Sequence, residues 1–327
     1  MRDFSYHRAA SAAAAQREAA LPATMLLAGG TTLLDLAKCG VAEPDRVVDI
    51  TRLDGLDGVR VDADGAVIGA LAKMSRVADD PAIRTQFPAV AESLALAASA
   101  QIRNMATIGG NLMQRTRCAY FRAPAVFPAC NKRAPGSGCA AIGGATRNHA
   151  VLGTSAACIA TYPGDLATAL VAFDAVVHVG ARTVPADAFF LAPGSTPERE
   201  HPLAPGELIT AVSIPASPAA RRSTYLKVRD RQSYEFAAAS AAVGLELEAD
   251  GRTIRDLRVA LGGVATKPWR ARAVEAALIG TALEAEAVRR ASRLAMEGAV
   301  DHGANRFKID LAPRVIARAV LTLGGMA

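Results

Sequence analysis

The chain has 327 residues, 51% hydrophobic and 21% charged, a balance typical of a globular protein with core material for two domains. Its net charge of +6 comes from scattered lysines and arginines without a basic run or interleaved aromatics, which argues against a nucleic-acid-binding protein. No stretch approaches about 20 uninterrupted apolar residues, and the first residues lack the basic and then apolar pattern of a secretory signal. We therefore expect neither a membrane span nor an export signal in this chain.

The first glycine-rich element follows an expected helix over 11–20 and a short buried strand over 25–28. Gly29 and Gly30 end the strand, and Thr31 can cap a helix that runs to about residue 38. A strand, two glycines and a helix start leave free backbone N–H groups pointing one way, which suits a pyrophosphate. Because this pattern is neither the three-glycine dinucleotide fingerprint nor the Walker loop, an ordinary turn remains the alternative.

A second glycine-rich element occurs about 80 residues later. Between the two, the pattern predicts a strand over 46–50, a hairpin over 59–69, a helix from Ser75 and a helix over 88–99. Gly109 and Gly110 again allow close backbone approach, and Thr107 and Asn111 add side-chain donors. The two elements could hold the two ends of one phosphate-containing ligand, or they could be two tight turns.

Four cysteines lie in or after a loop without periodicity, rich in proline, glycine and arginine: Cys118, Cys130, Cys139 and Cys158. A structureless loop of this length is uncommon unless something orders it. Four thiolates suit either tetrahedral Zn²⁺ or an iron–sulfur cluster, and the absence of paired C-x-x-C spacing favours a cubane cluster. Cys39 lies apart, near a helix end, where packing explains it. The negative charge of a cluster could be offset by Arg115, Arg117, Arg122, Lys132, Arg133 and Arg147.

The rest of the chain alternates between helix and strand. The expected elements are helices over 166–173 and 185–190, strands over 175–179, 208–214, 241–248 and 257–261, and helices over 269–278, 282–296 and 311–321. The segment 216–222 indicates a domain boundary. The last domain is expected to be a sheet with helices on one face.

Segments 26–33, 106–111 and 164–166 together resemble the FAD-binding subunits of the molybdenum hydroxylases, the xanthine dehydrogenase group, over essentially the whole chain. The cysteine-containing segments 131–139 and 147–153 are similar to the [4Fe–4S]-containing FAD subunits of bacterial periplasmic aldehyde oxidoreductases. The cluster-bearing insert of the 4-hydroxybenzoyl-CoA reductases is the nearest alternative within the family.

The resemblance implies an α+β fold with two domains. A two-lobed FAD-binding domain of the PCMH or vanillyl-alcohol-oxidase type would cover 1–219, with lobes over about 1–55 and 56–219 and a cluster-binding insert over about 115–160. A smaller C-terminal domain of the CO dehydrogenase flavoprotein type, a three-stranded sheet with helices, would cover 220–327.

The resemblance also assigns roles to single residues. The FAD pyrophosphate would be wrapped by Leu26, Leu27, Ala28, Gly29, Gly30, Thr31, Thr32 and Leu33. Thr107, Gly110 and Asn111 would form a second phosphate contact, and Asp165 would bind ribityl or ribose hydroxyls. Lys227 would lie near the flavin, although on its own it is equally consistent with a surface strand. The four cysteines named above would bind a [4Fe–4S] cluster, and no residue of this chain would act on the substrate.

The function implied by the resemblance is electron transfer. Electrons from a molybdopterin-binding large subunit would pass through a [2Fe–2S] small subunit to FAD, and from there to an external acceptor. The complex would be cytoplasmic, or periplasmic by co-export with a partner that carries a twin-arginine signal.

Two rival functions stay open at this point. One is a zinc-stabilised binding module, and the other is a stand-alone FAD oxidoreductase of the berberine-bridge or vanillyl-alcohol type. The latter needs its own base or a covalent flavin link, and the five histidines indicate no such site. His149 is the histidine placed closest in sequence to the cysteines.

Overall fold

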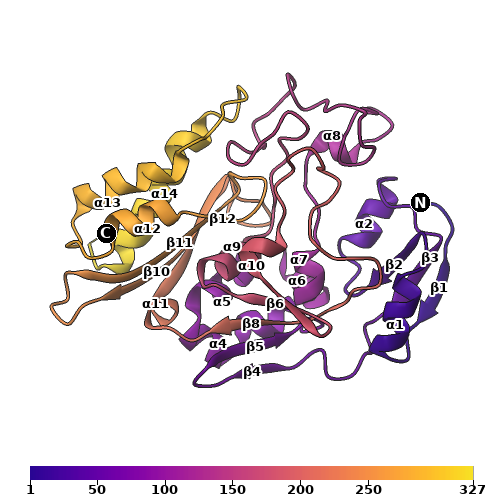
Figure 1. Ribbon diagram of the computed structural model, residues 1–327, viewed down its shortest axis with the longest axis horizontal. Coiled ribbons are helices and arrows are strands. Elements are labelled where there is room, and N and C mark those ends of the chain that lie inside the picture. Colours follow the sequence, from indigo (N-terminus) through magenta and orange to yellow (C-terminus); the bar gives the residue numbers. More distant parts are fainter. Residues whose placement is uncertain (327) are drawn as a thin grey trace.

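The computed structural model describes residues 1–326, and three sheets with their helices form its framework (Figure 1). The N-terminal lobe is a parallel sheet of order β1-β3-β2. Its elements are β1 (Ser5–Arg8), α1 (Ala12–Ala19), β2 (Thr24–Leu27), α2 (Leu33–Lys38) and β3 (Arg46–Asp49). The helices expected over 11–20 and up to residue 38 are confirmed. Strand β1 was not predicted, because all four of its residues are exposed and show no alternation of apolar and polar side chains.

The second lobe contains an antiparallel sheet of order β4-β5-β8-β6-β7. Its strands are β4 (Val59–Val61), β5 (Gly65–Gly69), β6 (Val176–Val179), β7 (Arg182–Pro185) and β8 (Ile209–Pro215). Its helices are α3 (Met74–Asp79), α4 (Pro81–Gln86), α5 (Pro88–Ala95), α6 (Ala100–Met105), α7 (Ile108–Leu112), α9 (Asp165–Ala172) and α10 (Ala186–Phe189). All eight residues of α9 are buried, because this helix packs against the strands of the third sheet as well as within its own lobe.

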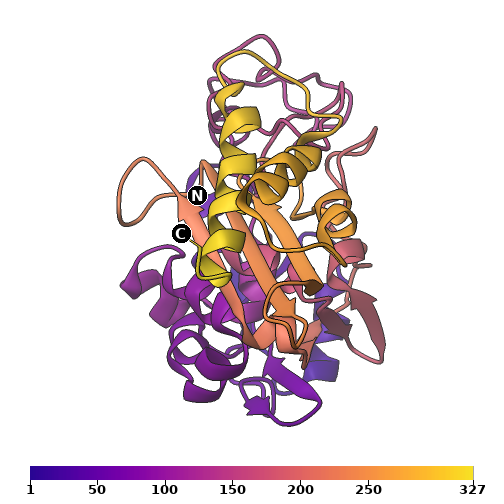
Figure 2. The same cartoon turned by 90° about the vertical axis from the view of Figure 1, so that its left-hand side faces the viewer.

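The C-terminal part is an antiparallel sheet of order β12-β11-β10-β9, so the prediction of three strands is wrong. Its elements are α11 (Pro218–Arg221), β9 (Ser223–Val228), β10 (Ala239–Leu247), β11 (Ile254–Gly262), β12 (Trp269–Arg270), α12 (Arg272–Leu278), α13 (Ala285–Ser292), the 3₁₀ turn η1 (Arg293–Met296) and α14 (Phe307–Leu323). Figure 2 shows α14 lying along one face of this sheet. The α+β class is confirmed, whereas the limits 1–219 and 220–327 stay a prediction.

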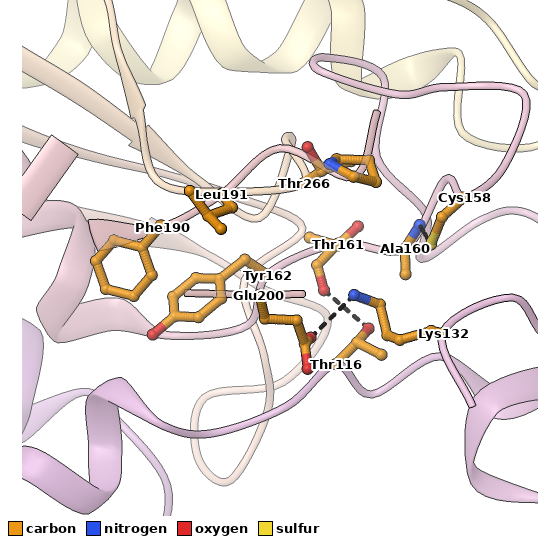
Figure 3. A pocket seen from close by; sticks show the side chains of 11 residues that line it. Thr116, Lys132, Cys158, Ala160, Thr161, Tyr162, Phe190, Leu191, Glu200 and Thr266 are labelled. Carbon is orange, nitrogen blue, oxygen red and sulfur yellow. Dashed lines mark hydrogen bonds and ion pairs between the residues drawn. The ribbon is translucent and has the colours of Figure 1, made fainter. Parts of the chain in front are cut away.

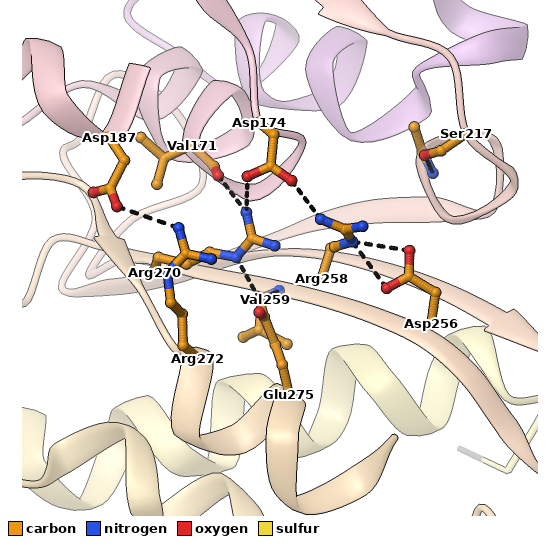
Figure 4. A network of polar contacts seen from close by, with 11 residues as sticks. Val171, Asp174, Asp187, Ser217, Asp256, Arg258, Val259, Arg270, Arg272 and Glu275 are labelled. Atoms are coloured by element: carbon orange, nitrogen blue, oxygen red, sulfur yellow. Dashed lines mark hydrogen bonds and ion pairs between the residues drawn. The ribbon is translucent and has the colours of Figure 1, made fainter. Parts of the chain in front are cut away.

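Arg270 explains why the chain extends at β12 instead of beginning a helix at Trp269 as expected (Figure 4). Its buried guanidinium donates to the carbonyl oxygen of Val171 at 2.7 Å and to Asp174 at 2.9 Å, both from the second lobe, and it also pairs with Glu275. A buried guanidinium needs this full set of acceptors. These contacts fix the third sheet against the second lobe.

The insert between α7 and α9 contains one short helix, α8 (Ala119–Arg122), and otherwise irregular backbone within the described residues, as expected for 115–160. Phe121 packs with Leu36 of α2. At the other end of the insert, Asn305 donates to the carbonyl oxygen of Ala150 at 2.9 Å. The insert is therefore held between the N-terminal lobe and the C-terminal part (Figure 1).

Candidate functional site

Both glycine-rich elements line one large cavity of about 680 Å³, which we call the first cavity. A second cavity of about 440 Å³ adjoins it, and the residues that line both are Thr31, Thr32, Gly110 and Gln114. The first cavity lies within the usual range of about 300–1,000 Å³ for small-molecule sites. Of the predicted pyrophosphate residues, those on its wall are Leu26, Ala28, Gly29, Gly30, Thr31, Thr32 and Leu33, together with Thr107 and Gly110, whereas Leu27 lines neither cavity.

The glycines serve two different purposes. A Cβ on Gly29 would collide with the backbone carbonyl of Met105, so this glycine lets the first element pack against the end of α6. A Cβ on Gly110 would meet only the Thr107 hydroxyl at 2.9 Å and then Ala28 at 4.0 Å, so this position faces the cavity. Gly29 is thus required for packing between two segments, and its approach to a phosphate stays a prediction.

The second glycine-rich element is helical rather than a turn. Thr107 is the N-cap of α7, and its hydroxyl accepts a bond from the backbone N–H of Gly110 at 3.2 Å. The first element differs, because the N-cap of α2 is Thr32 without a side-chain cap bond, so the predicted cap by Thr31 is wrong. Thr31 and Thr32 both line the wall shared by the two cavities.

Several buried polar atoms at the two cavities have no partner among the described residues and could bind a polar ligand. Among residues 1–326, seven buried side-chain nitrogen or oxygen atoms lack a hydrogen-bond partner, although most such atoms in proteins have one. Four of the seven lie on residues that line the cavities: Glu198 Oε2 and His201 Nδ1 on the first, and Asn111 Oδ1 and Arg117 Nε on the second. FAD, with its phosphates, hydroxyls and polar ring edges, fits this combination of apolar walls and unpaired polar groups.

Sequence reasoning did not identify Glu198 and His201. They lie in the irregular segment between α10 and β8, about 90 residues from the nearest glycine-rich element, and no local pattern marks them. Only the folded chain brings this segment to the cavity.

Asp165 and Lys227 form a buried ion pair. The ammonium of Lys227 lies 2.8 Å from Asp165 and also donates to the carbonyl oxygen of Leu96, and the Tyr225 hydroxyl donates to Asp165 at 2.6 Å. The Lys227 side chain is 1% exposed, so the surface-strand alternative is wrong. Burial raises the pKa of Asp165, and the positive charge of Lys227 and its hydrogen bond to Asp165 lower that pKa. Asp165 lines the second cavity, whereas Lys227 lines neither, so the pair connects α9 to β9 beside the site.

The four cysteines proposed as ligands all line one small cavity inside the insert, which we call the cysteine cavity. Cys130 and Cys139 face each other across an isolated β-bridge. Burial, with a smaller contribution from the nearby thiols of Cys130 and Cys158, raises the pKa of Cys118 to about 11. Within residues 1–326 no three His, Cys, Asp or Glu side chains converge to hold a single metal ion. The four cysteine residues instead line one small space. Thiolates are the ligands that soft metal clusters take, and a bound metal would stabilise the thiolate form.

The basic residues of the insert do not surround the cysteines as a group. Of the six that were expected to offset the charge of a cluster, Lys132 lines the cysteine cavity. Arg117 and Arg122 pair with Asp35 on α2, and Arg147 pairs with Asp230. The remaining two bind elsewhere: Arg115 pairs with Glu200, and Arg133 donates to backbone carbonyls of the insert.

His149 contacts the cysteine site rather than the first cavity. Its Nε2 lies 3.2 Å from the sulfur of Cys118, and its buried Nδ1 has no partner. Burial lowers the pKa of His149 to about 4, and the charge of Lys308 contributes. The imidazole is therefore neutral near pH 7.

Comparison with known proteins covers nearly the whole chain. Residues 2–217 match the FAD binding domain in molybdopterin dehydrogenase, and residues 224–323 match the CO dehydrogenase flavoprotein C-terminal domain. The chain is 45% identical to the aldehyde oxidoreductase FAD-binding subunit PaoB of Escherichia coli, over 85% of this chain and 86% of that protein. It is 29% identical to the carbon monoxide dehydrogenase medium chain of Hydrogenophaga pseudoflava, over 90% and 87% of the two chains.

Solved structures agree with these sequence matches. A structure of carbon monoxide dehydrogenase from Hydrogenophaga pseudoflava superposes with a TM-score of 0.76 at 26% identity, covering 99% of this chain and 98% of that one. None of the helices described here is both long and apolar enough to cross a lipid bilayer.

Proposed function

Since the chain belongs to the FAD-binding medium subunits of the molybdenum hydroxylase family, we propose that it is the electron-transfer subunit of a heterotrimeric molybdenum aldehyde oxidoreductase. In this proposal it binds FAD and a [4Fe–4S] cluster. Its partners are a molybdopterin-binding large subunit and a [2Fe–2S] small subunit.

The observation that carries the proposal is the convergence of both glycine-rich elements on one cavity with unpaired polar groups. FAD would lie along the wall shared by the two cavities, formed by Thr31, Thr32, Gly110 and Gln114. Asn111 and Asp165 would face it from the second cavity, where both residues lie. When bound, the flavin would supply the redox chemistry, and the chain would orient it and exclude water.

The cluster assignment rests on the four thiols around the cysteine cavity. Cys118, Cys130, Cys139 and Cys158 provide the four thiolates that a cubane cluster requires. The likeness to PaoB, an aldehyde oxidoreductase subunit by name, supports the aldehyde as the substrate class of the complex. In this scheme the substrate is bound by the large subunit, and an external acceptor takes electrons from the flavin. The compartment follows from the partners: the cytoplasm, or the periplasm when a partner carries a twin-arginine signal.

The test is anaerobic purification of the complex, followed by measurement of FAD, iron, zinc and the electron paramagnetic resonance spectrum. We expect one FAD per chain, iron beyond that of the [2Fe–2S] subunit, and a [4Fe–4S] signal after reduction. If the isolated chain contains zinc in place of iron, the cluster assignment is wrong and a zinc-stabilised binding module is favoured. Aldehyde oxidation by the isolated chain would overturn the division of labour, because the catalytic site would then lie in these residues.

A further inference from the structure

Lys132 occupies the junction between the flavin and cysteine sites. Lys132 lines both the cysteine cavity and the first cavity. It also lines a small cavity that shares lining residues with each of them (Figure 3). The side chain is 9% exposed. Its ammonium donates to Glu200 at 3.0 Å and to the carbonyl oxygen of Pro197 at 2.8 Å. Lys132 thus links the insert to the segment that carries Glu198 and His201.

The charges around this junction do not cancel. Glu200 pairs with Arg115 as well as with Lys132, so the three side chains together carry one net positive charge. Lys132 and Cys158 line the same wall of the small cavity, as Figure 3 shows. A buried charge acts more strongly on its neighbours than an exposed one, because water screens it less.

Resting on the proposed function, we propose that Lys132 is a positioning residue that couples the two cofactor sites. Its ammonium raises the reduction potential of the cluster held by the four cysteines, and its bond to Glu200 fixes the insert to the wall of the flavin cavity. Reduction adds one electron to the cluster, and a nearby fixed positive charge stabilises the added negative charge. Cluster potentials respond to net charge and solvent exposure in this way.

Four variants of the complex test the sign of this effect: Lys132→Met, Lys132→Arg, Glu200→Gln and Arg147→Gln. The measurements are iron and FAD content and the cluster midpoint potential, from a redox titration followed by electron paramagnetic resonance. Lys132→Met is expected to disfavour reduction by about tenfold, a fall of about 59 mV for one electron, at unchanged iron content. Lys132→Arg keeps the charge and is expected to restore the potential.

Glu200→Gln separates the charge from a purely structural role. Removing the negative charge of Glu200 is expected to raise the midpoint potential of the cluster. If the two substitutions acted only by loosening the insert, Lys132→Met and Glu200→Gln would shift the potential in the same direction. Arg147, exposed and paired with Asp230, is the matched control in the same insert, and Arg147→Gln is expected to leave the potential unchanged.

The inference is overturned if Lys132→Met retains iron at an unchanged potential, or if Glu200→Gln lowers it. If Lys132→Met loses iron, the midpoint potential of Glu200→Gln becomes the deciding measurement. An unchanged or lower potential in Glu200→Gln would then overturn the inference. A wild-type complex without [4Fe–4S] would instead refute the proposed function, and iron content reports that outcome separately.

Discussion

The first cavity and the cysteine insert are built in contrasting ways. The wall of the first cavity includes residues of β2, α2 and α7, whose backbone bonds form within regular elements. The insert has one short helix and depends on side chains that bind its backbone, as when Arg133 donates to the carbonyls of Tyr120 and Phe121. The first site can therefore be preformed, whereas the second owes its order to side-chain contacts and, in our proposal, to its cluster.

Loss of the cluster is the largest effect that this comparison predicts. Each Cys→Ser change at 118, 130, 139 or 158 is expected to reduce iron to the content of a complex without this site, because a hydroxyl is a poor ligand for iron in a cluster. FAD content is expected to stay near that of wild type, since none of the four cysteines lines the first cavity. Metal analysis and flavin absorbance measure both.

Cys39→Ser is the matched control, because Cys39 is the C-cap residue of α2 and does not line the cysteine cavity. It is expected to leave iron unchanged. Equal loss at Cys39, or full iron in Cys130→Ser, would contradict the assignment, and loss of FAD from all four variants would contradict the independence of the two sites.

The next largest effect concerns Asp165. Asp165→Ala leaves the ammonium of Lys227 buried without its carboxylate, which typically costs about 3–5 kcal/mol. We expect a loss of that size in the free energy of unfolding, measured by denaturant titration, together with weaker FAD binding. The double variant Asp165→Leu with Lys227→Met removes both charges and is expected to recover most of the stability. An equally unstable double variant would show that the ion pair is not the cause.

The sequence indicated the flavin site better than the surroundings of the cysteines. The two glycine-rich elements were visible because glycines, threonines and strand-to-helix transitions are local signals. That Gly109 and Gly110 lie in the helix α7 was not visible, because glycines are poor helix formers and tertiary packing overrides that tendency here. The structure places all four cysteines at one cavity, and their role as ligands stays a prediction.

Contacts between distant segments escaped prediction altogether. Of the six basic residues expected to offset the charge of a cluster, Lys132 lines the cysteine cavity. Four of the arginines pair with carboxylates of other segments, such as Asp35 or Asp230, and Arg133 donates to backbone carbonyls of the insert. Glu198 and His201 reach the first cavity from an irregular segment without a pattern. In strand β12, Arg270 binds the carbonyl oxygen of Val171 in the second lobe, and a contact between such distant segments cannot be predicted from local sequence propensity.

A smaller effect separates the two glycines of the flavin site. Gly110→Val directs a side chain into the cavity and is expected to abolish FAD binding while the protein keeps a single unfolding transition. Gly29→Val instead strikes the backbone of Met105 and is expected to lower the free energy of unfolding by about 1–3 kcal/mol, as overpacking does. Flavin occupancy and thermal unfolding of both variants distinguish them. Full flavin occupancy in Gly110→Val would contradict the place proposed for FAD.

The smallest predicted effect tests whether Thr107 acts as a helix cap, a flavin contact or both. Its hydroxyl oxygen already accepts from the Gly110 N–H, and loss of such a cap typically costs about 1 kcal/mol. Thr107→Ala is therefore expected to destabilise the protein by about that amount. Since Gly110 forms part of the flavin wall, it is also expected to weaken FAD binding.

Thr107→Ser keeps the hydroxyl and serves as the matched variant. If the hydroxyl is what matters, Thr107→Ser retains both stability and FAD affinity, measured by denaturant titration and by flavin titration of the apoprotein. An FAD affinity that falls in Thr107→Ala without any loss of stability would assign the hydroxyl to the ligand alone. If Thr107→Ala is destabilised but binds FAD as tightly as wild type, Thr107 acts only as a helix cap and does not contact the flavin. The wall of the first cavity would then present backbone rather than a side chain to FAD at this position.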